Sequence, residues 1–218
     1  MVIGEATTKT RLLEAGQRLM LRRGFTATRV DEVCAEAGVT KGSFFHYFES
    51  KDEFAEAVLG HNWSSTQPML RSAFAKSDDP LQRVHDYLDL FVAVAADPHV
   101  EKSCLFGNLS QEVAPTHPRL RSACRLGFSR WAEQVALRLE DAKQAHPPAI
   151  DFDSASLAAH LIAIYEGSLV LAKAAGDAQV LAANVEHFRR YLQTLFGTSR
   201  CNAEDHRKGG GRSERSHR

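Results

Sequence analysis

The sequence predicts an all-α fold. Apolar residues recur at three- and four-residue spacing along most of the 218 residues, which is typical of helices with one buried face. No run alternates apolar and polar residues with the β-branched enrichment of a strand. Glycines, prolines and capping residues fall where the helices would begin and end.

Composition narrows the class of protein. The 27 basic and 27 acidic side chains cancel, so a surface for a polyanion would have to come from local clustering. We expect no secretory signal and no uninterrupted apolar stretch of membrane-spanning length. None of the four cysteines is spaced as CxxC, which argues against a zinc site and against a disulfide-stapled secreted domain. We therefore expect a cytoplasmic protein without metal or cofactor.

Two helices are predicted at the N-terminus. Thr7 or Thr8 caps the first helix, and Gly24 ends it in the usual C-terminal glycine position. Thr28 is expected to cap the second helix, and Gly38 ends it. The second helix has a short apolar stripe, made of Val30, Val33, Cys34 and Ala37.

The third and fourth helices follow with little intervening chain. Thr40 is expected to cap the third helix, whose apolar anchors are Phe44, Phe45 and Phe48. Ser50 and Glu53 form a capping box for a fourth helix from Lys51 to about Phe74.

The remaining chain predicts five further helices and a tail. Prolines and glycines place the helices over 81–96, 105–113, 118–144, 154–175 and 179–196. The pattern collapses after residue 197. We expect residues 198–218 to form a disordered basic tail, with either weak phosphate attraction or no role.

The second and third helices form a compact helix-turn-helix over residues 29–48. In such a unit the N-terminal residues of the second helix enter the major groove of DNA. A lysine there can reach a phosphate or a guanine edge, hydroxyls can bond bases or phosphates, and a glycine lets DNA approach the backbone. The predicted DNA-binding residues are Thr28, Arg29, Thr40, Lys41, Gly42, Ser43, His46, Tyr47 and Lys51.

This region resembles the tetracycline-repressor (TetR) family over roughly residues 7–59. The resemblance is carried by Gly24, Phe25, Ala27, Thr28, Val30, Val33, the run from Ala37 to Phe48, and Ser50, Lys51 and Phe54. It implies an all-helical homodimer that binds a roughly palindromic DNA operator and is released from it by a small-molecule effector. The family usually has tyrosine where this chain has Phe45, and Tyr47 is the candidate to replace that backbone contact.

The resemblance also implies a division of the chain. We expect a helix-turn-helix DNA-binding domain over 1–50 and a helical effector-binding and dimerisation domain over 51–197, with no membrane association. Small residues on the helix over 154–175 would permit close helix approach. The stripe expected to form the dimer seam, or to pack within the subunit, is Leu181, Val185, Phe188, Leu192 and Leu195.

Cys104 heads the most distinctive phrase of the C-terminal half, Cys104 to Leu109. With Glu166 to Lys173 this phrase resembles the TetR branch that includes the N-ethylmaleimide-reductase repressor, some of whose members sense electrophiles through a cysteine. If Cys104 starts a helix, the helix field and nearby Lys102 would lower the pKa of its thiol. The alternative is a small buried hydrophobe.

An effector pocket needs apolar walls with a few polar groups. The candidate sensing or ligand-contacting residues are Cys104, Phe106, Trp131, His160 and Tyr165, with Phe91 and Phe128 as further wall residues. His85 and Asp89 share a helix face but have no evident third metal ligand. The chain lacks GxSxG, HExxH, P-loop and dinucleotide-binding motifs, so we expect no enzyme. The open alternative is a ligand-independent or partner-binding regulator.

Overall fold

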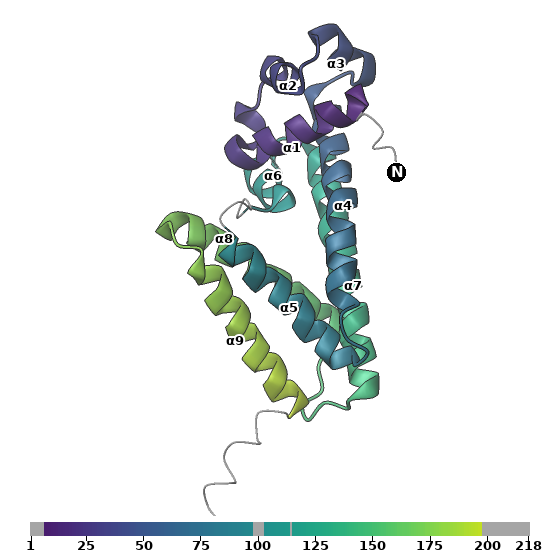
Figure 1. The fold of residues 1–218 in the computed structure, drawn as a ribbon, viewed down its shortest axis with the longest axis vertical. Helices are drawn as coiled ribbons and strands as arrows, with labels where there is room; N and C mark the ends of the chain where they lie inside the picture. The colour runs from purple at the N-terminus through teal and green to yellow at the C-terminus, as the bar shows by residue number, and fades with distance from the viewer. Residues whose placement is uncertain (1–6, 98–102, 114, 198–218) are drawn as a thin grey trace, which may run out of the picture.

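The computed structural model describes residues 7–97, 103–113 and 115–197, and within these ranges it contains helices and no strands (Figure 1). The predicted all-α class is therefore confirmed, and the predicted bounds are close to those found. The helices are α1 (Thr8–Ala27), α2 (Val30–Ala37), α3 (Lys41–Tyr47), α4 (Lys51–Phe74), α5 (Pro80–Ala96), α6 (Leu105–Val113), α7 (Pro118–Ala145), α8 (Ser154–Ala175) and α9 (Gln179–Phe196). The predicted tail, Lys102 and Cys201 lie outside the described residues.

The first three helices and the start of α4 form one end of the molecule, called the reading head below (Figure 1). Its centre is aromatic: the rings of Phe44 and Phe54 lie 5.0 Å apart, and those of Phe48 and Phe54 also 5.0 Å. All three side chains are buried. Three large rings in contact give a small head a core that short helices could not otherwise supply.

Two glycines shape the head. Gly24 has a φ of +82° and kinks α1, so the last residues of that helix turn away from its axis. Gly38 ends α2 in the left-handed conformation, with a φ of +63°. Both backbone conformations disfavour side chains with a Cβ, which explains glycine at the kink of α1 and at the end of α2. The helix predicted to end at Gly24 resumes after the kink and continues to Ala27.

The prediction that Thr28 is the N-cap residue of the second helix was wrong. Arg29, not Thr28, is the N-cap residue of α2, and the carboxylate of Glu32 accepts a hydrogen bond from the Arg29 amide at 3.1 Å. The Thr28 hydroxyl instead donates to the carbonyl oxygen of Gly24 at 2.7 Å. Thr28 therefore holds the kink of α1 closed, which sequence spacing alone could not distinguish from a cap.

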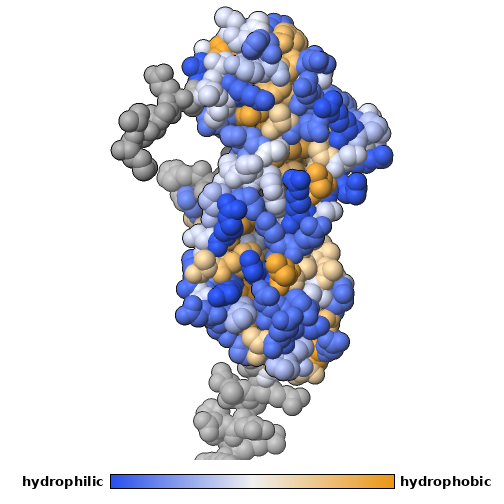
Figure 2. Space-filling view, turned by 90° about the vertical axis from the view of Figure 1, so that its right-hand side faces the viewer, coloured by the Kyte–Doolittle hydropathy of each residue, from blue (hydrophilic) through white to orange (hydrophobic). Residues whose placement is uncertain are grey.

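A second core lies among α4, α5, α7, α8 and α9. Leucine and aromatic side chains of all five helices meet there, and the indole of Trp131 donates a buried hydrogen bond of 2.6 Å to the Tyr87 hydroxyl. Figure 1 shows α4 and α7 running side by side from the head into this core. The face that they present in Figure 2 is mostly hydrophilic, with hydrophobic residues scattered over it.

α6 belongs to the packing of the head although it is far from it in sequence. Leu105, Leu109 and Val113 are buried in the same apolar cluster as Leu12, Leu19 and Phe54 of α1 and α4. Packing is thus continuous across residue 50, where the sequence suggested a domain boundary. That boundary remains a prediction.

One helix bears on the expectation of no uninterrupted apolar stretch of membrane-spanning length, although its apolar residues are interrupted by His160, Glu166 and Lys173. Among the described helices, α8 is long and apolar enough to cross a membrane by length and composition. Its Leu157, Leu161 and Leu169 are buried in the core that α8 forms with α7 and α9. That burial is the arrangement of a core helix.

Candidate nucleic-acid interface and ligand cavity

The start of α3 is ordered by its own hydroxyl groups. The Thr40 hydroxyl accepts a hydrogen bond of 3.2 Å from the Ser43 amide, and the two hydroxyl oxygens lie 3.0 Å apart. Thr40 remains exposed and Ser43 partly exposed. The N-terminus of α3 is therefore fixed and open to solvent, as an edge inserted into a DNA groove must be.

Lys41 at the start of α3 forms an ion pair with an acidic residue of α2. Its ammonium group lies 2.9 Å from a carboxylate oxygen of Asp31 on α2, and both side chains are more than half exposed. An exposed ion pair of this kind stabilises the fold by less than about 1 kcal/mol. A DNA phosphate can therefore replace Asp31 at little cost.

Gly42 has no packing role within the described part of the chain. A Cβ at this position would approach nothing closer than the Thr40 hydroxyl oxygen, at 3.7 Å. Its φ is not in the left-handed region. Neither packing nor backbone geometry demands glycine here, so the backbone at the start of α3 is open to close approach.

The aromatic residues of α3 divide into two faces, and the sequence analysis placed one of them wrongly. Phe44 is fully buried, but Phe45, expected in the core, is 51% exposed. His46 and Tyr47 are exposed beside it, as expected. Phe44 and Phe48 are both buried on the inner side, and the helical turn of about 100° per residue carries Phe45 away from that side. Phe45 therefore joins the exposed edge as an apolar candidate for a thymine methyl group.

Two predicted DNA contacts are occupied elsewhere. The Thr28 side chain is only 1% exposed, so it cannot present its hydroxyl to DNA. The Lys51 ammonium donates to the carbonyl oxygen of Thr26 at 3.2 Å and lies 4.3 Å from the centre of the Phe25 ring. Burial lowers the pKa of Lys51. Arg29 is exposed at the start of α2, where a phosphate contact is sterically possible.

Arginines of α1 orient the helix-turn-helix, and the sequence analysis missed them. Arg11 donates to the carbonyl oxygens of Ala37 and Gly38, at 3.1 and 2.9 Å, and so binds the C-terminus of α2. Arg18 and Arg22 both pair with Glu36. The i, i+7 and i+11 spacing of Arg11, Arg18 and Arg22 on α1 indicates that these arginines share one face of the helix.

A cavity of about 320 Å³ opens between the head and the second core. Residues of α1, α4, α5, α6, α7 and α8 line it. Of the predicted sensing or ligand residues, Cys104, Phe106, Trp131 and Tyr165 all line this cavity, as does Phe91. This volume lies within the range of small-molecule sites.

His160 and Phe128 do not belong to the lining. His160 is exposed on α8, with its ring 6.1 Å from that of Tyr191 on α9. The prediction failed because α8 is apolar nearly all round, so periodicity could not tell its inner face from its outer one. Phe128 instead packs behind the cavity, stacked against Trp131.

Cys104 precedes α6 directly, but the expected lowering of its thiol pKa was wrong. Burial raises that pKa, and the nearby Glu166 carboxylate, which accepts a hydrogen bond from the thiol, raises it further. Backbone N–H groups of α6 act in the opposite direction and are outweighed. The pKa of Glu166 is also raised by burial. Cys104 is therefore a protonated thiol at neutral pH in this conformation.

The wall of the cavity is connected to the reading head through α6. Lys173 of α8 donates to the Ser103 hydroxyl and to the Asn108 amide oxygen, at 3.0 and 3.2 Å. At the other end of α6, the Glu112 carboxylate accepts hydrogen bonds of 2.7 Å from the amides of both Phe25 and Thr26. These amides follow the Gly24 kink of α1.

Electrostatics favour the charged form of Glu112. Burial acts to raise its pKa, but the hydrogen bonds from Thr26 and Phe25 and the charge of Lys51 outweigh it, so the pKa lies below its usual value of 4.5. One carboxylate thus binds the α1 kink and attracts the lysine that starts α4. A movement of α6 must act on both.

The His85 and Asp89 face is closed by an arginine. Arg189 of α9 lies 3.3 Å from the His85 ring nitrogen and pairs with Asp89. Burial and the charge of Arg189 lower the pKa of His85. No group of three or more metal-ligating side chains occurs in the described ranges.

The predicted dimer seam is part of the subunit core. Its five residues, Leu181, Val185, Phe188, Leu192 and Leu195, are buried against α5 and α8. An apolar stripe with four- and three-residue spacing can pack within the subunit or against a second subunit. The sequence alone therefore could not distinguish these two arrangements. The exposed apolar side chains of this region lie instead on the opposite side of α8 and α9, including Val170, Leu171 and Tyr191.

These features define a helix-turn-helix transcriptional regulator: a fixed, exposed N-terminus of a short second helix, on a small head joined to a larger helical core. Comparison with known proteins gives the family. Residues 12–58 match the family described as "Bacterial regulatory proteins, tetR family". Residues 80–188 match the family described as "Tetracyclin repressor-like, C-terminal domain". The chain belongs to the TetR family of DNA-binding transcriptional regulators.

Individual relatives agree with this assignment. The chain is 27% identical to the HTH-type transcriptional repressor NemR of Escherichia coli (strain K12) over 191 residues, which cover 87% of this chain and 96% of NemR. It is also 27% identical to the repressor DhaR of Mycobacterium sp. (strain GP1), over 85% of this chain and 88% of DhaR. NemR represents the branch that the C-terminal phrases resembled.

Solved structures show the same architecture. The crystal structure of reduced E. coli NemR matches with a TM-score of 0.76 at 27% identity, covering 84% of this chain and 95% of that one. A TetR regulatory protein from Rhodobacter sphaeroides matches with a TM-score of 0.73 at 27% identity, covering 85% and 97% of the two chains.

Proposed function

We propose that this protein is a homodimeric repressor that binds a palindromic operator through the start of α3 and leaves it when a small molecule or reactive electrophile occupies the Cys104 cavity. The observation that carries the proposal is the exposed edge from Thr40 to Ser43. It combines an ordered helix start, a lysine in a weak ion pair and a glycine without a packing role. Such a regulator acts in the cytoplasm, where its DNA is, and needs no enzymatic activity.

The proposed dimer uses the outer face of α8 and α9. Leu171 on α8 is 56% exposed, and Tyr191 on α9 is 46% exposed. The small residues Ala163 and Gly167, which lie on α8 between His160 and Leu171, are also exposed. Small residues beside large apolar ones allow two copies of the helix pair to approach closely and bury this face. A two-fold dimer presents two reading heads, which requires an operator of two related half-sites.

The proposed release acts through α6. A ligand in the cavity contacts Cys104 to Phe106 at the start of α6 and the aromatic wall behind it. Because Glu112 at the other end of α6 binds the Phe25 and Thr26 amides, displacement of α6 would tilt the reading head. A ligand that favours the tilted state releases DNA by shifting the population toward it.

A reactive electrophile is the second form of effector. The protonated Cys104 thiol is a poor nucleophile, so an electrophile would need a conformation in which burial and Glu166 no longer raise the thiol pKa. A regulator without a ligand is the remaining alternative. The 320 Å³ cavity, with its mixed aromatic and polar lining, favours the ligand-responsive function.

DNA binding is tested with a duplex carrying the region upstream of the protein's own gene. Fluorescence anisotropy over a series of salt concentrations would compare the wild type with Lys41→Ala and with the control Lys76→Ala, which removes an exposed lysine remote from α3. We expect Lys41→Ala to weaken binding and to reduce the salt slope by about one. Unchanged binding by Lys41→Ala would contradict the proposed reading edge.

Release is tested with N-ethylmaleimide as the electrophilic probe. The wild type bound to the duplex should dissociate after alkylation, and Cys104→Ser should stay bound, with peptide mass spectrometry identifying the modified cysteine. If Cys104→Ser dissociates to the same extent, the thiol-sensing form of the proposal is wrong. Cys34→Ser is the matched control, since Cys34 is buried in the reading head.

A further inference from the structure

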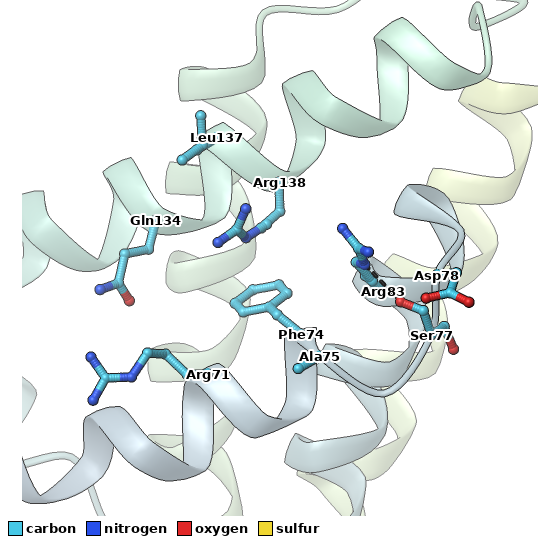
Figure 3. Close-up of a pocket in the computed structure, with 9 residues that line it drawn as sticks. All are labelled: Arg71, Phe74, Ala75, Ser77, Asp78, Arg83, Gln134, Leu137 and Arg138. Carbon is cyan, nitrogen blue, oxygen red and sulfur yellow. Dashed lines mark hydrogen bonds between the residues drawn. The ribbon is translucent and has the colours of Figure 1, made fainter.

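A second cavity lies at the end of α4 farthest from the reading head (Figure 3). It measures about 460 Å³ and shares no lining residue with the Cys104 cavity. Its walls come from the C-terminal end of α4, the turn that follows, the start of α5, and α7. The proposed repressor mechanism does not use it.

The lining is strongly basic. The lining contains three guanidinium groups, those of Arg71, Arg83 and Arg138, and one carboxylate, that of Asp78. The lining therefore carries a net positive charge. Within the described ranges, the Arg71 side chain forms no ion pair and no hydrogen bond. An arginine left without an anionic partner beside two others is a ready binding site for an oxyanion.

The other two arginines are oriented by neutral or local contacts. Arg83 donates through Nε to the Ser77 carbonyl oxygen at 2.7 Å, which leaves its terminal nitrogens available. The guanidinium carbon of Arg138 lies 5.7 Å from the centre of the Phe74 ring. Its ion pair with Asp141, at 3.1 Å, is half exposed and joins residues one helical turn apart. Neither contact neutralises the cavity.

Phe74 forms an apolar centre among these charges. Figure 3 shows its ring between Arg71 on one side and Arg83 on the other, with Arg138 reaching toward it from α7. Leu137, exposed on α7, adds a second apolar group to the lining. The combination of guanidinium groups and an aromatic ring suits a ligand that has both an anionic head and an apolar body.

We propose that this cavity binds a small organic oxyanion, a carboxylate or phosphate monoester on an aromatic body. Arg71 and Arg138 would hold the anionic head, because guanidinium groups form paired, charge-assisted hydrogen bonds with such oxygens, and Arg83, on the other side of the Phe74 ring, would add positive charge. Phe74 and Leu137 would contact the body. The site is independent of DNA binding and of the Cys104 cavity.

Calorimetric titration of the full-length protein without DNA tests the proposal. The probes are benzoate, phenyl phosphate and benzamide, the last being a neutral molecule of nearly the same shape as benzoate. We expect saturable binding of an anion and none of benzamide. The anion that binds more tightly identifies the head group as carboxylate or phosphate.

Variants assign the binding to the cavity. Arg71→Gln and Arg138→Gln should each weaken anion binding about tenfold, the effect of losing one charge-assisted contact. Arg125→Gln is the matched control, an exposed arginine on α7 outside the lining, and should bind as the wild type does. Arg71→Gln removes no recorded internal hydrogen bond, so it should fold normally. Absence of saturable binding, equal binding of benzamide, or equal effects of Arg71→Gln and Arg125→Gln would overturn the proposal.

Discussion

The reading head and the Cys104 cavity differ in where their polar groups lie. In the head, charged side chains sit on the surface in exposed pairs, such as Lys41 with Asp31 and Arg23 with Glu32. Around the cavity, Cys104 and Glu166 lie together, half-buried, and both have raised pKa values. Exposed pairs exchange partners at little energetic cost, whereas buried groups respond strongly to anything that enters. The head suits contact with a polyanion, and the cavity suits the ligand response proposed above.

The largest expected effect separates the two faces of α3. Phe44→Ala should lower the free energy of unfolding by about 3–5 kcal/mol, since it empties the aromatic centre of the head. Phe45→Ala, one residue on, should change it by less than about 0.5 kcal/mol because Phe45 is mainly exposed. Urea denaturation measures both. Equal destabilisation by the two variants would contradict the assigned orientation of α3.

The next effect concerns the wall of the cavity. Tyr87→Phe removes the acceptor of the buried Trp131 indole N–H and should lower the free energy of unfolding by about 1–3 kcal/mol. Under conditions in which the variant is fully folded, its affinity for DNA should equal that of the wild type, because Tyr87 is remote from the start of α3. A variant of unchanged stability would show that the indole finds another acceptor.

A similar comparison sharpens the proposed dimer. Leu171→Glu places a charge on the outer face of α8 and should give a monomer by light scattering with gel filtration. Leu126→Glu makes the same change at a similarly exposed position on α7 and should leave the dimer intact. A dimeric Leu171→Glu protein would place the interface elsewhere.

The smallest effect lies in the connection between the two regions. Because the pKa of Glu112 is lower in the folded protein than its usual 4.5, its contribution to stability is present above about pH 4.5 and is lost as the pH falls through the folded pKa. Glu112→Gln should cost less than about 1 kcal/mol at pH 7 and reduce the loss of stability on acidification. Denaturation at a series of pH values measures this. An unaltered pH profile would show that the charge of Glu112 does not hold the α1 kink.

Local sequence signals predicted the helices and their ends well, but they predicted poorly which side of a helix is buried. Caps and glycines such as Thr40, Gly38 and Gly176 act within a few residues, so helix ends could be read from the sequence. Whether Phe45, His160 or the Leu181 stripe points inward depends on which helices pack against them. That information is not local, and the same reason concealed the link from Glu112 to Phe25 across 87 residues of chain.

The candidate site was predictable to a similar degree. The α3 edge follows from one continuous motif, and four cavity residues follow from their apolar, aromatic character. The lowered thiol pKa expected for Cys104 was wrong because burial among neighbouring helices raises that pKa, and Glu166 of α8 raises it further. Charge effects on a buried group need the three-dimensional neighbours.

Hydroxyl-radical footprinting of the wild-type protein on the region upstream of its own gene tests the central claim most directly. A dimer with two α3 edges should protect two patches related by two-fold symmetry, with centres about one helical turn or a multiple of it apart, and Lys41→Ala should lose both patches together. A single unpaired patch, no protection, or a footprint that Lys41→Ala leaves unchanged would contradict the account.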